Sequence, residues 1–130
     1  NQFDIVFSNS VIEHEGSYEN MIKFSKEHMR VGKYYYCQTP NFWFPLEPHF
    51  IFLFFHFLPD PIKIRLVNNF NLGHFEKTKN KESLKVIESC KLIDAHMLKM
   101  LFKDGKILSE YFLFLKKSIT ITNFNEKALQ

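Results

Sequence analysis

The stretch FDIVFSNS (residues 3–10) decides how this chain folds. Its apolar part, Phe3 and residues 5–7, is rich in β-branched and aromatic side chains. Such a run is typical of a strand that is buried on both faces of a parallel sheet. The short polar residues Ser8, Asn9 and Ser10 then favour a turn. We therefore expect a buried strand that ends at these residues.

A helix and a second strand follow. Ser17 can cap a helix, and Gly32 is predicted to end it at the C′ position. The expected inward stripe of this helix consists of Tyr18, Ile22, Ser25 and Met29. Residues 34–37 (YYYC) then form a second buried-strand candidate, which stops at Thr39-Pro40-Asn41. The order strand, helix, strand predicts a right-handed parallel βαβ unit.

The pattern changes over residues 42–75. This segment holds four of the 5 prolines, the single tryptophan and more than half of the 16 phenylalanines. We predict a Phe-rich insert with a loop and short helical pieces over residues 50–58 and 62–70. The insert can line an apolar pocket or form a small core of its own, and the sequence leaves both open.

The remaining residues predict two helices and two strands. Residues 81–90 are amphipathic, with Leu84 and Ile87 expected inward, and Asp94 can cap the next helix. Residues 107–112 and 119–122 are expected to form an antiparallel pair, because their connection is short.

Composition narrows the class of protein. The net charge of +3 and the mixed signs along the chain argue against nucleic acid as a partner. Cys37 and Cys90 have no metal-binding spacing, which favours free thiols in a cytoplasmic protein. The apolar run at residues 50–58 is far shorter than the roughly 20 residues of a membrane helix. The oligomeric state is not predicted by any of these features.

The two polar strand ends are the best candidates for a site. Parallel neighbours bring Ser8-Asn9-Ser10 and Thr39-Pro40-Asn41 to the same edge of the sheet, where open α/β sheets bind ligands. Ordinary strand-ending turns would have the same composition, so both interpretations remain open.

Residues 3–14, which end in Ile12-Glu13-His14, resemble the fourth-strand motif of class I S-adenosylmethionine-dependent methyltransferases. Residues 33–41 are similar to the fifth strand of that family, which closes on Thr-Pro-Asn. The segment FPLEPH (residues 44–49), together with residues 98–102, Lys117-Ser118 and the final strand, resembles a bacterial, type 11-like branch. The resemblance implies a Rossmann-like α/β fold that is incomplete. Residues 1–130 would be the C-terminal part of one domain, with strands four to seven, and the cofactor-binding N-terminal half would be absent.

The chain departs from the family pattern in three respects, of which the smallest is Glu15, at a position where an apolar residue is common. Phe114 stands where a glycine is common, so the family pattern does not predict the conformation of the turn before the last strand. None of the 4 glycines lies in a Gly-rich loop that could hold a cofactor, and no acidic residue can be assigned to its ribose. We therefore expect these residues alone to be inactive.

The resemblance also implies roles for individual residues. Asn9 and Ser10 would lie beside the methionine end of S-adenosylmethionine. The acceptor side would be formed by Thr39, Pro40, Asn41 and Trp43. His49 would be the catalytic residue, a general base for the acceptor, or else a histidine packed among aromatic rings.

No metal site is expected from the sequence. Some relatives hold a divalent ion with Glu-x-x-Glu-His, but Ser10 occupies the first of these positions here. Glu13 and His14 alone are a poor ligand set for a hard cation, and His14 is expected to orient the start of a helix.

The implied activity is methyl transfer from S-adenosylmethionine to a small or lipid-like acceptor. Two other hypotheses stay open, a non-catalytic interaction module and a membrane-surface protein that uses the Phe-rich insert.

Overall fold

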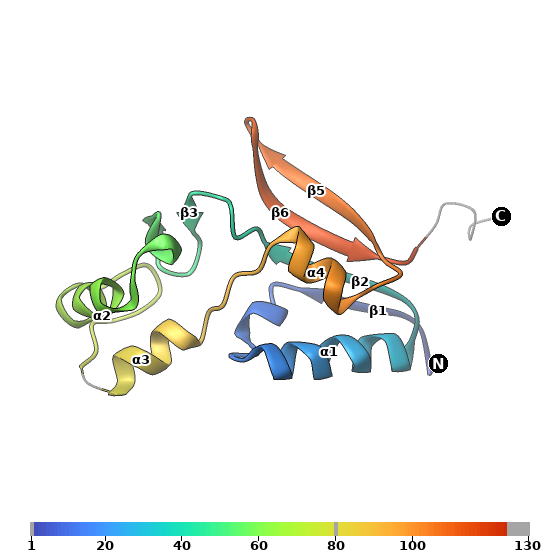
Figure 1. The fold of residues 1–130 in the computed structure, drawn as a ribbon, viewed down its shortest axis with the longest axis horizontal. Coiled ribbons are helices and arrows are strands. Elements are labelled where there is room, and N and C mark those ends of the chain that lie inside the picture. The colour runs from blue at the N-terminus through green and yellow to red at the C-terminus, as the bar shows by residue number, and fades with distance from the viewer. Residues whose placement is uncertain (1, 80, 125–130) are drawn as a thin grey trace.

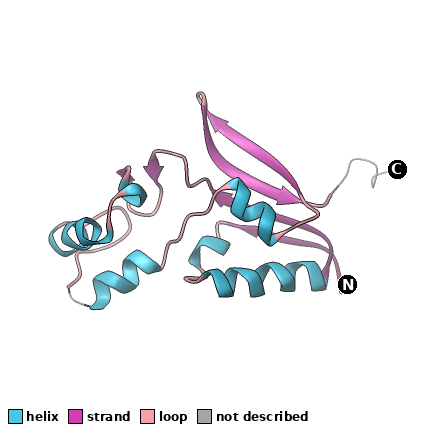
Figure 2. Ribbon diagram, in the orientation of Figure 1, coloured by secondary structure: helices cyan, strands magenta, loops and turns pink. Residues whose placement is uncertain are grey.

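The computed structural model describes residues 2–79 and 81–124 as a mixed α/β protein (Figures 1 and 2). Its elements are β1 (Phe3–Asn9), η1 (Ile12–His14), α1 (Tyr18–Val31), β2 (Gly32–Pro40), β3 (Leu46–Glu47), β4 (Phe52–Leu53), η2 (Phe55–Phe57), α2 (Asp60–Asn69), α3 (Lys81–Glu88), α4 (Ala95–Leu101), β5 (Lys106–Phe112) and β6 (Leu115–Thr122). The main sheet has the order β1-β2-β6-β5. The α/β class is therefore confirmed.

The predicted pairing of the first two strands is confirmed. β1 runs parallel to β2, with Phe3 opposite Gly32 and Asn9 opposite Gln38. β6 pairs antiparallel with β2, and β5 pairs antiparallel with β6 as expected. The turn before the last strand, for which no conformation was predicted, consists of Leu113 and Phe114 between β5 and β6, and Leu113 has a φ of 56°.

Helix α1 begins as predicted, but its inward face is different. The Ser17 hydroxyl accepts a hydrogen bond from the Asn20 amide at 3.2 Å, which is the expected cap. Of the predicted stripe, Ser25 is buried and Met29 packs against the main core, as expected, whereas Tyr18 and Ile22 are exposed. Met21, which was not predicted to face inward, is fully buried. Lys91 Nζ lies 4.0 Å from the centroid of the exposed Tyr18 ring, in a cation–π contact.

Gly32 ends helix α1 for a reason that differs from the prediction. Its φ of −98° and ψ of 137° are extended, not left-handed, so the expected C′ geometry is wrong. A Cβ atom here would lie 2.7 Å from both the Tyr34 carbonyl oxygen and Val6 Cγ2. Glycine is therefore needed because β1 and β2 approach each other closely at this point.

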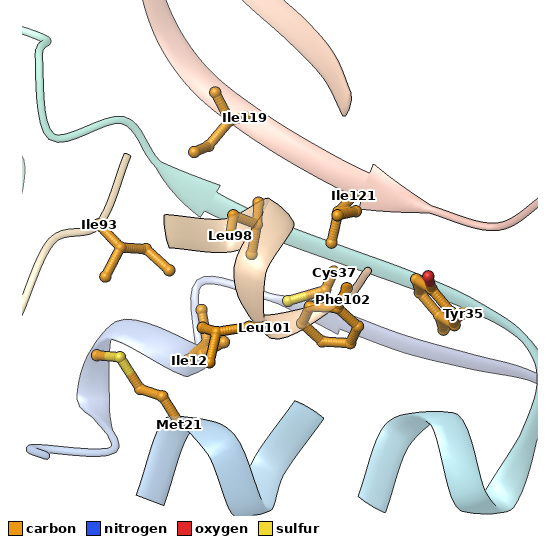
Figure 3. Close-up of a cluster of buried hydrophobic side chains, with 10 residues drawn as sticks. All are labelled: Ile12, Met21, Tyr35, Cys37, Ile93, Leu98, Leu101, Phe102, Ile119 and Ile121. Carbon is orange, nitrogen blue, oxygen red and sulfur yellow. The ribbon is translucent and has the colours of Figure 1, made fainter. Parts of the chain in front are cut away.

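The main core lies between the sheet and helices α1 and α4 (Figure 3). Tyr35 and Cys37 from β2 and Ile119 and Ile121 from β6 belong to the same cluster as Phe102, which directly follows α4. Alternate residues of each strand face this core, which is why the period-two pattern locates it. Both cysteines are free, as predicted, and Cys37 is buried.

Residues 42–90 form a second group, which we call the aromatic lobe; the other described residues are the sheet region. In Figure 1 the lobe lies to one side of the sheet region. Its own cluster of buried rings contains Phe50 and Phe55, with Val67 from α2 and partly buried residues of α3 against them. The predicted helix over residues 62–70 is confirmed as α2.

Two predictions in the aromatic lobe were wrong in part. Residues 50–58 contain a short helical piece, the 3₁₀ helix η2, but residues 52 and 53 form the short strand β4, and Phe54, between β4 and η2, has a φ of 61°. This left-handed residue interrupts any helix, and β4 pairs with β3. Leu84 of α3 is exposed, because Ser83, Val86 and Ile87 occupy the inward face.

The other face of the sheet has no helix over β1 among the described residues. Phe3, Ile5 and Phe7 are exposed there by 60%, 58% and 65%, so the prediction that this strand is buried on both faces is wrong for the described residues. Phe7 stacks on Tyr36 with centroids 5.1 Å apart. β1 is also the edge strand of the sheet. In the described part of the chain, the helices are too short or too polar to cross a membrane.

Candidate functional site

The ends of β1 and β2 lie side by side, as the parallel pairing requires. The Ser10 amide donates to the Gln38 carbonyl oxygen at 3.0 Å. The Ser10 hydroxyl lies 3.3 Å from Asn9 Oδ1 and 3.4 Å from Gln38 Oε1, and its single hydrogen can serve only one of them. Ser10 has a φ of 53°, which is uncommon for a residue other than glycine. The polar residues that follow β1 are therefore hydrogen-bonded to the end of β2.

A buried carboxylate lies just below these exits. Glu13 is fully buried, and its Oε2 accepts a hydrogen bond from the Thr39 hydroxyl at 2.9 Å. Its Oε1 has no hydrogen-bond partner among the described residues. A buried carboxylate with one free oxygen is costly, which makes the Thr39 contact important for the local structure.

The remaining predicted acceptor residues divide between the interior and the surface. Asn41 is buried and donates from Nδ2 to the Lys116 carbonyl oxygen at 3.0 Å, so its side chain holds the start of β6. Pro40 ends β2 and lies opposite Ser118. Trp43 is 64% exposed and donates from Nε1 to Asp94 Oδ2 at 3.3 Å. Of these residues, Trp43 presents the largest free surface.

His49 lies in a cluster of polar side chains at the boundary between the two regions. Its Nδ1 is 2.7 Å from Oε1 of Glu47, a carboxylate that is 1% exposed and also accepts the Phe50 amide at 2.6 Å. Its Nε2 is 3.1 Å from Nε2 of His14. His14 Nδ1 is in turn 3.0 Å from the Ser89 carbonyl oxygen and 3.7 Å from the Cys90 sulfur.

The surroundings of His49 favour its protonated form. The neighbouring Cys90 sulfur and the Glu47 carboxylate raise the pKa of His49 to about 10, against the effect of burial. An imidazolium donates protons and does not accept them at neutral pH. The general-base role of His49 stays a prediction without support from this environment.

Three members of this cluster were missed by the sequence analysis. Glu47 lies within the segment that carries the family resemblance, yet no role was given to it. Cys90 was considered only as a free thiol, and His14 either as a helix-orienting residue or, with Glu13, as a poor ligand pair for a hard cation. Their meeting depends on how the lobe folds back, and no local spacing encodes that contact.

A shallow pocket elsewhere on the surface contains none of the predicted site residues. It lies along helix α1 and is lined by Glu15, Asn20, Lys23, Phe24, Glu27 and His28.

Comparisons with protein-family models, with curated proteins and with solved structures found no match to this chain.

Proposed function

We propose that this chain supplies the acceptor-binding half of an S-adenosylmethionine-dependent methyltransferase and acts as part of a longer chain. The observation that carries the proposal is the parallel β1–β2 pair with its two polar exits in contact. The motifs at these exits, Asn9-Ser10 and Thr39-Pro40-Asn41, are the ones that resemble the family. Ligands of open α/β sheets bind beyond the carboxyl ends of such strands.

The proposed reaction is an in-line displacement. The nucleophile of the acceptor attacks the methyl carbon, and the electrons of the broken carbon–sulfur bond go to the sulfur of the cofactor. The main contribution of the protein is then to hold the two reactants aligned. Asn9 and Ser10 would border the methyl group, and Trp43 would contact the acceptor.

The uncovered face of the sheet supports the need for further chain. Phe3, Ile5 and Phe7 form an apolar row on β1, whose outer edge faces no other strand of the sheet. An edge strand with a row of exposed apolar side chains is prone to pair with another segment. The N-terminal half of such a domain, if it were joined to these residues, would cover both the row and the edge.

The aromatic lobe supports an acceptor with an apolar part. Trp43, Phe54 and Phe57 are exposed, and the Phe57 ring lies 6.0 Å from Trp43 and 6.4 Å from Phe54 between centroids. Exposed apolar clusters of this kind often mark binding surfaces. A lipid-like acceptor would bury them.

The test is to produce the protein encoded when the reading frame is extended upstream of residue 1. We expect the longer protein to bind S-adenosylmethionine with micromolar affinity in calorimetry, and residues 1–130 alone to show no such binding. Asn9→Ala should weaken binding to the longer protein by about tenfold, which corresponds to the loss of one hydrogen bond. Asn69→Ala, an exposed change at the end of α2, is the control.

Three outcomes would overturn the proposal. The upstream frame could close without a Gly-rich loop, the longer protein could fail to bind the cofactor, or residues 1–130 could bind it alone.

A second candidate is a non-catalytic interaction module, which is favoured by the same open edge of β1. It predicts that the purified chain forms a stable complex through this edge. A monomer in gel filtration would count against it.

The membrane-surface hypothesis was made for the Phe-rich insert, but a different segment, the exposed tip of the β5–β6 hairpin, favours it more. Phe112, Leu113, Phe114 and Leu115 are all exposed there, next to Lys116 and Lys117. Sedimentation with anionic vesicles tests it, and a chain that stays in the supernatant rejects it.

A further inference from the structure

We propose that His14, His49 and Cys90 form a binding site for a zinc-type divalent cation at the boundary between the sheet region and the aromatic lobe. The potential ligand atoms of these three residues all lie within 4.8 Å of one another. Imidazole and thiolate are the ligands that zinc prefers in proteins. His14 lies in η1, His49 in the loop after β3 and Cys90 in the segment after α3. Because the three residues are far apart in the sequence, they form no recognisable motif.

The hydrogen bonds of the two histidines define their tautomers. The Ser89 carbonyl oxygen can only accept, so Nδ1 of His14 carries a hydrogen. The Glu47 carboxylate likewise accepts from Nδ1 of His49 at 2.7 Å. In the neutral form of each ring, the remaining nitrogen, Nε2, then has a lone pair.

The two Nε2 atoms are only 3.1 Å apart, so two neutral rings would set one lone pair against the other. Such an arrangement is repulsive unless a positive charge lies between the nitrogens, and that charge is either a shared proton or a metal ion. Two nitrogens that bind one tetrahedral zinc at roughly 2.0–2.1 Å are about 3.3 Å apart. The observed separation therefore suits a common metal ion after a small adjustment.

The outer hydrogen bonds match those of metal-binding histidines. Such histidines donate their other N–H to a carboxylate or a backbone carbonyl, which orients the ring and makes Nε2 a better ligand. His49 uses the buried Glu47 in this way, and His14 uses Ser89. Glu47 is itself held by the Phe50 amide, so the ring of His49 has a fixed support.

Three protein ligands leave a fourth position for water or another small ligand. On binding, the Cys90 thiol would release its proton and coordinate as the thiolate. The ion would also join the two regions, because His14 belongs to the sheet region, whereas His49 and Cys90 belong to the aromatic lobe. This inference does not depend on the proposed methyltransferase function.

The experiment is a titration of the purified, metal-free chain with Zn²⁺. A separate metal-free sample is titrated with Co²⁺, which serves as a spectroscopic probe. We expect one ion per chain, a rise in melting temperature that a chelator reverses, and a sulfur-to-cobalt charge-transfer band. Cys90→Ser should abolish that band. Glu47→Gln removes the negative charge that supports His49 and also changes the acceptor of the Phe50 amide, and it should weaken binding by roughly 10- to 100-fold.

His14→Ala should abolish binding, and His96→Ala, an exposed histidine on α4, is the matched control that should leave it unchanged. Circular dichroism of each variant shows whether it is folded. If a folded wild-type chain binds no Zn²⁺, or if Cys90→Ser retains the charge-transfer band, the inference is wrong. A proton shared by His14 and His49 in the presence of excess Zn²⁺, seen by nitrogen chemical shifts, would also overturn it.

Discussion

The sheet region and the aromatic lobe bury their apolar side chains in different ways. In the sheet region, β2 and β6 present alternate residues to two helices, and the resulting core contains side chains from every layer. In the lobe, three buried apolar side chains are surrounded by partly buried rings. Exposed apolar side chains occur in both regions, for example Phe54 and Phe57 in the lobe and Phe7 and Phe114 in the sheet region. The buried cluster of the sheet region is the larger of the two, so we expect it to contribute more to the free energy of unfolding than the small cluster of the lobe.

The largest expected effect tests that division by removing one ring from each core. Phe102 is fully buried, and its centroid is 5.0 Å from that of Tyr35. Phe102→Ala should lower the free energy of unfolding by about 3–5 kcal/mol, because it leaves a cavity in the main core. Urea denaturation measures this change.

Phe55→Ala is the matched variant in the lobe, where Phe55 stacks on Phe50 at 4.1 Å. Hydrogen exchange should accelerate in the lobe and stay slow in β2 and β6 if the two regions open separately. Equal acceleration in both regions would show a single cooperative unit and remove the distinction. Phe70→Ala, an exposed change, should have little effect on either.

A smaller loss of stability is expected from changing Thr39, whose hydroxyl donates to the buried carboxylate of Glu13. Thr39→Val removes the hydrogen bond to the buried Glu13 and leaves its carboxylate without this partner. The cost should be about 1–3 kcal/mol, the usual penalty for an unsatisfied buried polar group. Thr39→Ser keeps the hydroxyl and should restore most of the stability. A stable Thr39→Val variant would mean that water already satisfies Glu13.

The sheet region could be predicted from sequence because its signals are local. The runs at residues 5–7 and 34–37 alternate or stay apolar over a few positions, and Ser17 and Asp94 sit directly before their helices. The direction of a helix face is a weaker signal, since Tyr18 and Met21 are both apolar and only tertiary contacts decide between them. Asn9, Ser10 and Thr39 were found for the same local reason, as polar residues that follow apolar strands.

The aromatic lobe could not be predicted in the same way. Its phenylalanines occur too densely to show a period, so the pattern did not distinguish a helix from the observed β4 and η2. The cluster of His14, His49 and Cys90 joins residues that are 35 and 76 positions apart. Contacts of that sequence separation follow from the packing of the whole chain and leave no mark on neighbouring residues.

The smallest expected effect is a pH dependence of stability that originates at His28, on helix α1 beside the main core. Burial lowers the pKa of His28, although its hydrogen bond to the Phe24 carbonyl and the charges of Glu15 and Glu27 act in the opposite direction. The ring is half-buried against Phe24, with centroids 4.1 Å apart.

The folded protein therefore keeps His28 neutral at a pH where the unfolded chain is already protonated. Its contribution to stability is fully present above the unfolded value of 6.5 and is lost as the pH falls toward the lower folded pKa. Urea midpoints between about pH 7.5 and 5.5 measure this loss, and His28→Gln should make the slope shallower. His96→Gln removes an exposed imidazole as the control. An equal reduction of the slope in both variants would show that the acid sensitivity does not originate in the main core.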